Sequence, residues 1–410
     1  MPERRFDFHS RTRLMYGDGL IDSLGELVRE YGGTRALVVT DSGIAKAGHA
    51  ARAESSIVKA GLVAFVYDRV RENPNTQHVA DCVAAARQHD IDFIVGLGGG
   101  SSMDTAKGSN FILTNGGKMA DYWGVNKAQK AMLPLIAVPT TAGTGSECQS
   151  FALISDEVTH QKMACGDDKA YARVALLDPL LTLSQPPRVT ANTGIDTITH
   201  ALESHVTSGN TAISQLFSRE SWKLAEGSMD TVLKQPADLA ARGRMLLASA
   251  YGGTAIAQSM LGAVHSAANP LTAHYGIVHG QAVGMMLPFV VRFNSKDPHT
   301  LQNYVDLAAS VGLARRSDEP AESLDAMLAR LCELLAAAEM PDSLKDCGVA
   351  HDALPKLAEE AARQWTANFN PVKINAADFL ALYEAAFQSR RETLKFKPQP
   401  PASRRKEPGW

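Results

Sequence analysis

The order of strand-like and helix-like segments is the feature that most constrains the fold of this chain. In the first half, short apolar and β-branched runs at 35–40, 63–67, 93–97 and 133–138 alternate with helical segments. Strands separated by helices form parallel βαβ units, and continuously apolar strands are covered on both faces. After Pro186-Pro187 the strand signals stop, and Ala/Leu-rich helical periodicity continues to about Gln388.

This change of pattern predicts two domains. We expect a Rossmann-like α/β domain with a parallel sheet at residues 1–186 and an all-helical domain at residues 187–389. The Pro-rich, basic segment 390–410 is expected to be a flexible tail, which is favoured over a docking motif.

Charge and composition exclude several classes of partner. The chain has 410 residues, with 41 Lys and Arg against 44 Asp and Glu. Nucleic acid and anionic membranes call for clustered basic residues, so neither is expected as a partner. The longest uncharged stretch, 245–291, is interrupted by His, Asn, Gly and Pro, and no signal-peptide pattern is seen near the N-terminus. Five scattered cysteines without CxxC predict reduced thiols and a cytoplasmic location.

A glycine-rich turn, Gly96–Lys107, follows an apolar strand and begins a helix. Glycines let the backbone approach an anion closely, and the N-terminus of a helix favours a phosphate. The usual G-x-G-x-x-G spacing fails, because Ser101 stands where the third glycine is expected. A purely structural strand-to-helix turn is the alternative.

A second polar turn, Pro139–Glu147, also follows an apolar strand and contains four hydroxyls and two glycines. It can present donors to a ribose, a phosphate or a nicotinamide amide, or it is a loop that needs several turn conformers. Two such turns at the carboxyl ends of parallel strands predict a ligand crevice. Asp41, at the end of an earlier strand, either accepts hydrogen bonds from a ribose 2′-OH, which favours NAD over NADP, or caps a helix.

The centre of the chain is rich in histidine. Asp196 and His200 are four residues apart in a helical segment and so share one face, although such a pair is also common as a surface hydrogen bond. His265, His274 and His279 follow in the uncharged stretch, where each could instead be a hydrogen-bonded core residue. Together they make a metal cluster the simpler account, and a carboxylate with imidazoles suits Fe²⁺ or Zn²⁺. The spacing does not say which histidines bind.

Taken together, these segments resemble the iron-containing (group III) alcohol dehydrogenase family. The matching stretches, in family order from about residue 5 to 388, are GGGSSMDTAK, PTTAGTGSE, LLDPLLTLSQPP, TGIDTITHALE, the GAVH…ANPL…VHG segment and Asn370-Pro371. The resemblance implies a dinucleotide-binding α/β domain followed by a helical metal-binding domain. It also implies a metal-dependent oxidoreductase that transfers a hydride between NAD(H) and a small alcohol/aldehyde pair, as a homodimer or larger homo-oligomer.

Site residues follow from the resemblance, position by position. One divalent metal would be held by Asp196, His200, His265 and His279. The residues that would line the NAD(H) site are Asp41, Asn73, Gly99, Gly100, Ser101, Thr140, Thr141, Thr144 and Lys162. Asp104 and Lys107 would support the glycine turn.

One position departs from the family pattern. The family commonly has a second His four residues after the third metal ligand, where this chain has Asn269. Asn forms hydrogen bonds but does not shuttle a proton near pH 7. A water chain, a catalytic role for His274 or a different natural reaction would account for the change. In the alternative interpretation, His274 packs between helices and has only a structural role.

Two other functions remain open at this level. One is a hydroxyacid–oxoacid transhydrogenase that keeps its cofactor bound. The other is a non-catalytic cofactor-binding protein, although four intact ligand positions argue against a decayed site.

Overall fold

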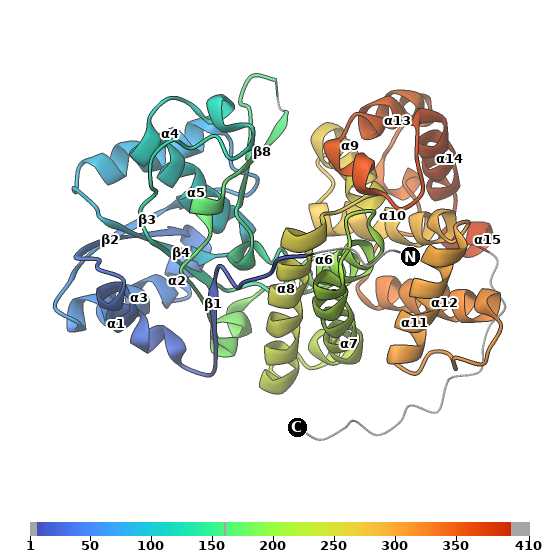
Figure 1. Ribbon diagram of the computed structural model, residues 1–410, viewed down its shortest axis with the longest axis horizontal. Coiled ribbons are helices and arrows are strands. Elements are labelled where there is room, and N and C mark those ends of the chain that lie inside the picture. The colour runs from blue at the N-terminus through green and yellow to red at the C-terminus, as the bar shows by residue number, and fades with distance from the viewer. Residues whose placement is uncertain (1–5, 160, 395–410) are drawn as a thin grey trace. The chain divides into compact units, whose positions relative to one another are not determined.

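The computed structural model describes residues 6–159 and 161–394, whose contacts group into two compact units (Figure 1). The sheet unit comprises Asp7–Pro186 together with Ala237–Gly253. Of the described residues, the helical unit contains Phe6, 187–236 and 254–394. Each unit has its own fold, and they are described separately.

The sheet unit is built on a six-stranded, wholly parallel sheet in the order β1-β9-β6-β4-β2-β3. This confirms the predicted parallel α/β fold. Its strands are β1 (Arg13–Tyr16), β2 (Arg35–Asp41), β3 (Val63–Val70), β4 (Phe93–Gly98), β6 (Leu135–Pro139) and β9 (Val174–Leu177).

Helices that alternate with the strands cover both faces of the sheet. They are α1 (Leu24–Glu30), α2 (Ser42–Lys46), α3 (His49–Lys59), α4 (Thr76–Arg87) and α5 (Gly100–Asn115). Val38 and Val95 pack in one core cluster with α1 and α3, whereas Leu37 and Ile94 pack in a second with α4 and α5. Because successive strand residues point to opposite faces, the continuously apolar strands fill both clusters.

Several short strands were not predicted from the sequence. Two of them, β1 and β9, belong to the six-stranded sheet. The others form a small second sheet in the order β5-β8-β7, with β5 (Gly124–Val125), β7 (Phe151–Ser155) and β8 (Lys162–Gly166). They have two to five residues. Periodicity over so few residues does not separate a strand from a loop.

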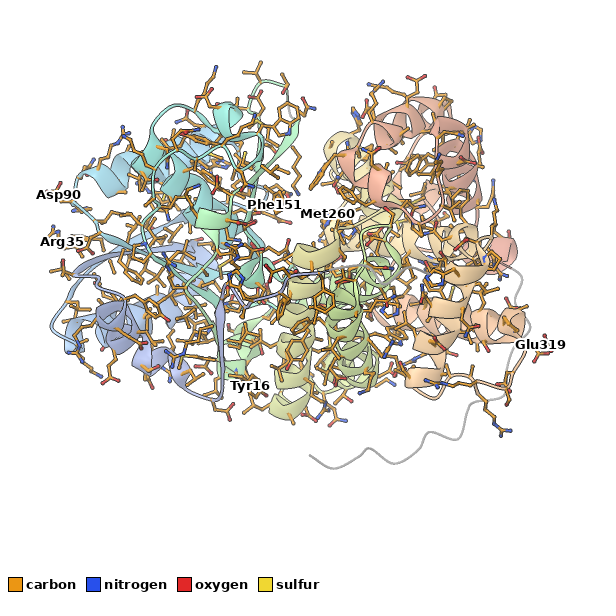
Figure 2. All side chains as sticks on the ribbon, in the orientation of Figure 1. Tyr16, Arg35, Asp90, Phe151, Met260 and Glu319 are labelled. Carbon is orange, nitrogen blue, oxygen red and sulfur yellow. The ribbon has the colours of Figure 1, made fainter. Side chains whose placement is uncertain are left out.

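The carboxyl ends of β2, β4 and β6 lie side by side in the parallel sheet. From this edge α2 and α3 lead to β3 on one side, and α5 leads toward β6 on the other, so the strand order switches between β2 and β4. Arg35 and Asp90 mark the opposite edge, where the Arg35 Nε donates to the carbonyl of His89 at 2.9 Å (Figure 2). The glycine-rich turn and the second polar turn therefore lie at the edge where ligands of open α/β sheets generally bind.

The helical unit contains no strand among its described residues, as predicted. Its helices are α6 (Pro187–Val206), α7 (Ala212–Lys234), α9 (Ala263–Tyr275), α10 (His279–Asn294), α11 (Pro298–Ser310), α12 (Pro320–Ala337), α13 (Leu354–Ala362), α14 (Ala376–Phe387) and α15 (Arg390–Leu394). Helix α6 packs against α7, α10 and α11. Its first residue is Pro187, whose fixed φ and missing N–H suit the start of a helix.

Helix α8 (Leu239–Ser259) is divided between the two groups of contacts. Its part up to Gly253 belongs to the sheet unit, whereas the sequence assigned all of 187–389 to the helical domain. Glycines explain the difference, because a Cβ on Gly253 would lie 2.2 Å from the carbonyl oxygen of Gly145. Only a residue without a side chain permits this close approach between α8 and the second polar turn.

The C-terminal segment begins differently from the predicted tail. Residues 390–394 form α15, and the Arg390 guanidinium is buried beside Asp342 at 3.5 Å. Residues 395–410 lie outside the described part of the chain. None of the helices in the described part has the length and apolar character needed to cross a bilayer. No disulfide joins the cysteines of the described residues.

Candidate metal and dinucleotide sites

Helix α6 is buried along most of its length although its sequence is polar. Several of its hydroxyls form hydrogen bonds within the helix: Thr197, Thr199 and Ser204 each donate to the carbonyl four residues earlier, at 2.6–3.1 Å. Asp196, His200 and Glu203 are among the ionisable side chains of this helix, and each is at most 5% exposed. They need partners from other helices, because unpaired buried charge is costly.

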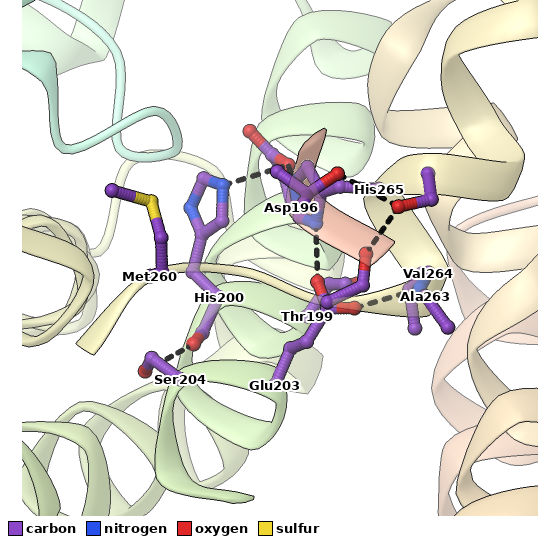
Figure 3. Close-up of polar contacts among 12 residues, drawn as sticks. Asp196, Thr199, His200, Glu203, Ser204, Met260, Ala263, Val264 and His265 are labelled. Atoms are coloured by element: carbon purple, nitrogen blue, oxygen red, sulfur yellow. Dashed lines mark hydrogen bonds and ion pairs between the residues drawn. The ribbon is translucent and has the colours of Figure 1, made fainter. Parts of the chain in front are cut away.

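The four predicted metal ligands come together in the helical unit. Asp196 Oδ1 lies 3.4 Å from His200 Nε2, 3.8 Å from His265 Nε2 and 3.8 Å from His279 Nε2. The ligand atoms of Asp196, His265 and His279 all lie within 4.8 Å of one another. The rings of His200 and His265 are stacked with centroids 5.0 Å apart. Figure 3 shows Asp196 beside His265, with a dashed line from the ring of His200 to Asp196.

This donor set fits a divalent cation. Asp196 Oδ1 and His265 Nε2 are buried and make no hydrogen bond to the described residues. Ligands at about 2.1 Å from a tetrahedral ion are about 3.4 Å apart, which is close to the distances observed. A cation among these atoms would therefore satisfy polar groups that the protein leaves unsatisfied.

The electrostatics of the cluster also favour a bound cation. Burial opposes ionisation of Asp196, but the surrounding imidazoles hold the pKa of its carboxyl well below the usual value. Burial likewise lowers the pKa of His265, but Glu203 and Asp196 more than offset this and raise it to about 9. The protein thus favours positive charge at the centre of the cluster, which protons or a metal ion would supply.

Sequence reasoning missed Glu203 as part of this site. It lies one turn after His200 on α6, and its carboxylate accepts hydrogen bonds from His265 Nδ1 at 2.5 Å and from the Val264 N–H at 2.6 Å (Figure 3). The signal was present, because positions 196, 200 and 203 fall on one face of a helix. A ligand spacing alone does not reveal which acid supports a ligand.

The two residues predicted to be catalytic lie on the same helix as His265 but have other partners. Asn269, one turn after His265, donates from Nδ2 to Gln364 Oε1 at 3.1 Å. His274, in the last turn of α9, pairs through Nε2 with Glu360 Oε2 at 2.6 Å, and its side chain is 38% exposed. The observed partner of His274 is therefore a carboxylate of α13 at the surface.

The predicted dinucleotide residues gather in the sheet unit, where the turns after β4 and β6 pack against each other. A Cβ on Gly100 would lie 2.7 Å from Thr144 Cγ2, and one on Gly99 would lie 3.3 Å from the Thr141 side chain. Gly98 has φ +146°, which side chains rarely adopt. Ser101 is in the first turn of α5. The hydroxyl of Thr140 is buried without a hydrogen-bond partner among the described residues.

Asp41 serves as a helix cap in this structure. Its Oδ1 accepts hydrogen bonds from the Gly43 N–H at 2.8 Å and the Ile44 N–H at 3.0 Å, at the start of α2. The other oxygen faces the glycine turn, because it lies 3.6 Å from where a Cβ on Gly98 would be. The two roles proposed from the sequence are therefore compatible, since each uses a different oxygen.

Asn73 and Lys162 approach the same edge through the small sheet. Asn73 has a left-handed backbone, with φ +50°. The Ser155 N–H donates to the Pro74 carbonyl at 2.9 Å, and Ser155 pairs with Lys162 across β7 and β8. The hairpin therefore ties the segment that follows β3 to the first residue of β8.

Lys107 supports a different turn from the one predicted. Its fully buried Nζ donates to the carbonyls of Ser146, Gln149 and Phe151 at 2.6, 2.7 and 3.2 Å. The ammonium thus organises the end of the second polar turn rather than the glycine turn that precedes it. Burial lowers the pKa of Lys107 to about 8.

Comparisons with known proteins identify the family of this chain. Residues 11–179 match the family described as iron-containing alcohol dehydrogenase, and residues 190–387 match the C-terminal part of the Fe-containing alcohol dehydrogenase family. Alcohol dehydrogenase 4 of Schizosaccharomyces pombe is 32% identical over 372 residues, which cover 91% of this chain and 87% of that protein.

Solved structures show the same fold. A 1,3-propanediol oxidoreductase is 30% identical with a TM-score of 0.90, covering 94% of this chain and 100% of that chain. A sulfoacetaldehyde reductase from Bifidobacterium kashiwanohense, solved in complex with NAD+, is 28% identical with a TM-score of 0.84, covering 93% and 99%. The chain described here belongs to the iron-containing alcohol dehydrogenase family.

Proposed function

We propose that this oxidoreductase reduces small aldehydes, or oxidises the corresponding alcohols, with NAD(H) and one divalent metal. The observation that carries the proposal is the position of Asp196 Oδ1, 3.4–3.8 Å from three imidazole nitrogens. In this proposal Asp196, His200, His265 and His279 hold the cation. A divalent cation supplies a Lewis acid that polarises a carbonyl and stabilises negative charge on oxygen.

The residues of the sheet unit are assigned to the dinucleotide. The backbone at Gly99 and Gly100, at the start of α5, suits a pyrophosphate because N–H groups and the helix dipole favour an anion there. Ser101, Thr140, Thr141 and Thr144 supply hydroxyls around it. The free oxygen of Asp41 suits a ribose 2′-OH and would repel a 2′-phosphate, which favours NAD over NADP. Asn73 and Lys162 complete the proposed site.

The balanced reaction adds a hydride from NADH and a proton to the aldehyde and yields the alcohol and NAD+. Asn269 cannot supply that proton near pH 7, and its amide already binds Gln364. His274 is paired with Glu360 at the surface. In this proposal the proton therefore comes from solvent water.

The substrate class is proposed from the relatives. Their names refer to an alcohol, to 1,3-propanediol and to sulfoacetaldehyde, all of them consistent with short chains. We infer short aldehydes, including those with a second polar group. Fe²⁺ is the proposed metal and Zn²⁺ the alternative, because one carboxylate with three imidazoles accommodates both. A cytoplasmic location and a homodimeric state are further parts of the proposal, the second testable by sedimentation.

A panel of short aldehydes tests the activity. The metal-free protein is reloaded with Fe²⁺ or Zn²⁺, and oxidation of free NADH is followed with each aldehyde. Turnover of free NADH that requires metal is the expected result. Exchange between a hydroxyacid and an oxoacid without net NADH use would instead identify a transhydrogenase, and absence of both metal and NADH binding would identify a non-catalytic protein.

A further inference from the structure

Glu203 is a buried carboxylate that no part of the proposed reaction uses directly. It is 3% exposed and receives two short hydrogen bonds from consecutive residues, the Val264 N–H at 2.6 Å and His265 Nδ1 at 2.5 Å. One bond is to backbone and the other to an imidazole. The Glu203 side chain thus binds both the backbone at the start of α9 and the imidazole ring of His265.

The hydrogen bond to the ring has a chemical consequence. A carboxylate only accepts, so when the His265 ring is neutral its one proton resides on Nδ1 and the lone pair resides on Nε2. Nε2 is the atom that faces Asp196 Oδ1 and has no hydrogen-bond partner among the described residues. A carboxylate that binds the far nitrogen of a metal-binding imidazole also raises the basicity of the near one.

Side-chain hydrogen bonds also fix the backbone at the N-terminus of α9. The Ala263 N–H donates to Asn370 Oδ1 at 3.3 Å, and Asn370 exchanges two amide hydrogen bonds with Asn294 at 2.7 and 3.1 Å. A Cβ on Gly262 would lie 3.1 Å from Asn370 Oδ1 and 3.2 Å from Glu203 Oε1. The first two N–H groups of α9 are therefore capped by side chains from two other parts of the helical unit.

We propose that Glu203 is a positioning residue that sets the tautomer and direction of His265, so that Nε2 is presented to the metal. Asn370 is its partner in fixing the N-terminus of α9. This inference rests on the proposed metal site. It adds to that site a residue, Glu203, that binds neither metal nor substrate and yet determines the metal affinity.

The test uses Co²⁺ as the probe and compares Glu203→Gln with Glu360→Gln. Glu360 is a matched control because it also pairs with a histidine of α9, His274, at 2.6 Å. The amide introduced by Glu203→Gln would present an N–H to Nδ1 of His265 and so favour the tautomer with its proton on Nε2. We expect Co²⁺ affinity, measured by visible absorption with a competing chelator, to fall by about 10- to 100-fold in Glu203→Gln. Glu360→Gln should bind Co²⁺ like the wild type.

A second readout does not require metal. The ¹⁵N spectrum of histidine in the metal-free protein reports which ring nitrogen carries the proton, and His265→Ala identifies the signal. Because the pKa of His265 is about 9, the spectrum is recorded above that pH, where the ring is neutral. We expect Nδ1–H in the wild type and a shift toward Nε2–H in Glu203→Gln. If circular dichroism shows that Glu203→Gln does not fold, Glu203→Asp keeps the carboxylate but withdraws it by one methylene, and it should lower Co²⁺ affinity as well.

The outcomes separate the two levels of the proposal. Wild-type affinity for Co²⁺ in a folded Glu203 variant, with the tautomer unchanged, would overturn the role of Glu203 and leave the metal site intact. If Asp196→Asn also left Co²⁺ binding unchanged, the proposed metal site itself would be wrong.

Discussion

The two candidate sites of this protein are built in opposite ways. The dinucleotide edge of the sheet unit depends on backbone, because Gly98, Gly99 and Gly100 lie where side chains would clash or strain the chain. The metal cluster of the helical unit depends on charge, with Asp196 and the histidines buried around one point. The first site should therefore be sensitive to added atoms and the second to changed charge.

The largest expected effect comes from Asp196→Asn. The substitution keeps the shape of the side chain but removes the negative charge that faces three imidazoles. Metal affinity should fall by more than about 100-fold, beyond the range seen for residues outside the ligand shell. Activity should fall with it. Metal analysis after dialysis measures the loss of affinity. Retained metal with full activity would show that the cluster does not depend on the charge of Asp196.

Gly100→Ala adds one methyl group to the other site. Its Cβ would lie 2.7 Å from Thr144 Cγ2, so one of the two turns must shift at a cost of about 1–3 kcal/mol. We expect roughly a tenfold or greater loss of NADH affinity, measured by fluorescence titration, with metal content unchanged. The matched control is Gly227→Ala on the exposed face of α7, where no atom lies within 4 Å. That change should leave NADH binding unaltered.

Asp41→Asn separates the two roles of Asp41. Asn caps helices as well as Asp does, so stability should change by less than about 0.5 kcal/mol. The charge that repels a 2′-phosphate is lost, so the ratio of kcat/KM for NADPH to that for NADH should rise. Asp41→Ala, which removes the cap as well, should cost about 1 kcal/mol in thermal or urea unfolding. An unchanged cofactor ratio would assign Asp41 to capping alone.

Asn269→His introduces a titrating group one turn from His265. The new imidazole should add a limb to the pH dependence of kcat between about pH 6 and 8, because histidine changes charge there. The wild type should lack this limb. An identical profile in both proteins would show that position 269 does not take part in proton transfer.

The smallest effect is expected for His274→Ala. Its ion pair with Glu360 is partly exposed, and such pairs contribute less than about 1 kcal/mol. The pH–rate profile should be unchanged, since the ring is bound to a surface carboxylate. Loss of a limb near pH 6–8 would instead support a proton-transfer role for His274.

Sequence reasoning succeeded where information is local. The alternation of strands and helices, the two polar turns and the pairing of Asp196 with His200 all depend on spacing of a few residues. It failed for β1, β5 and the other short strands, because runs of two to five residues are too short for periodicity to separate a strand from a loop. The sequence assigns residues 237–253 to the helical domain, whereas their contacts group with the sheet unit, since the contact of Gly253 with Gly145 cannot be read from either segment.

The amino-acid sequence by itself determined the class of each unit and the set of residues from which the sites are drawn. The tertiary structure decided which of them meet. Asp196 meets His279 rather than His274 because α9 ends and α10 begins between the two histidines, which turns them toward different neighbours. Glu203 became part of the site only when the N-terminus of α9 met it through the Val264 N–H and His265 Nδ1, because helical periodicity determines a face but not the partner that covers it.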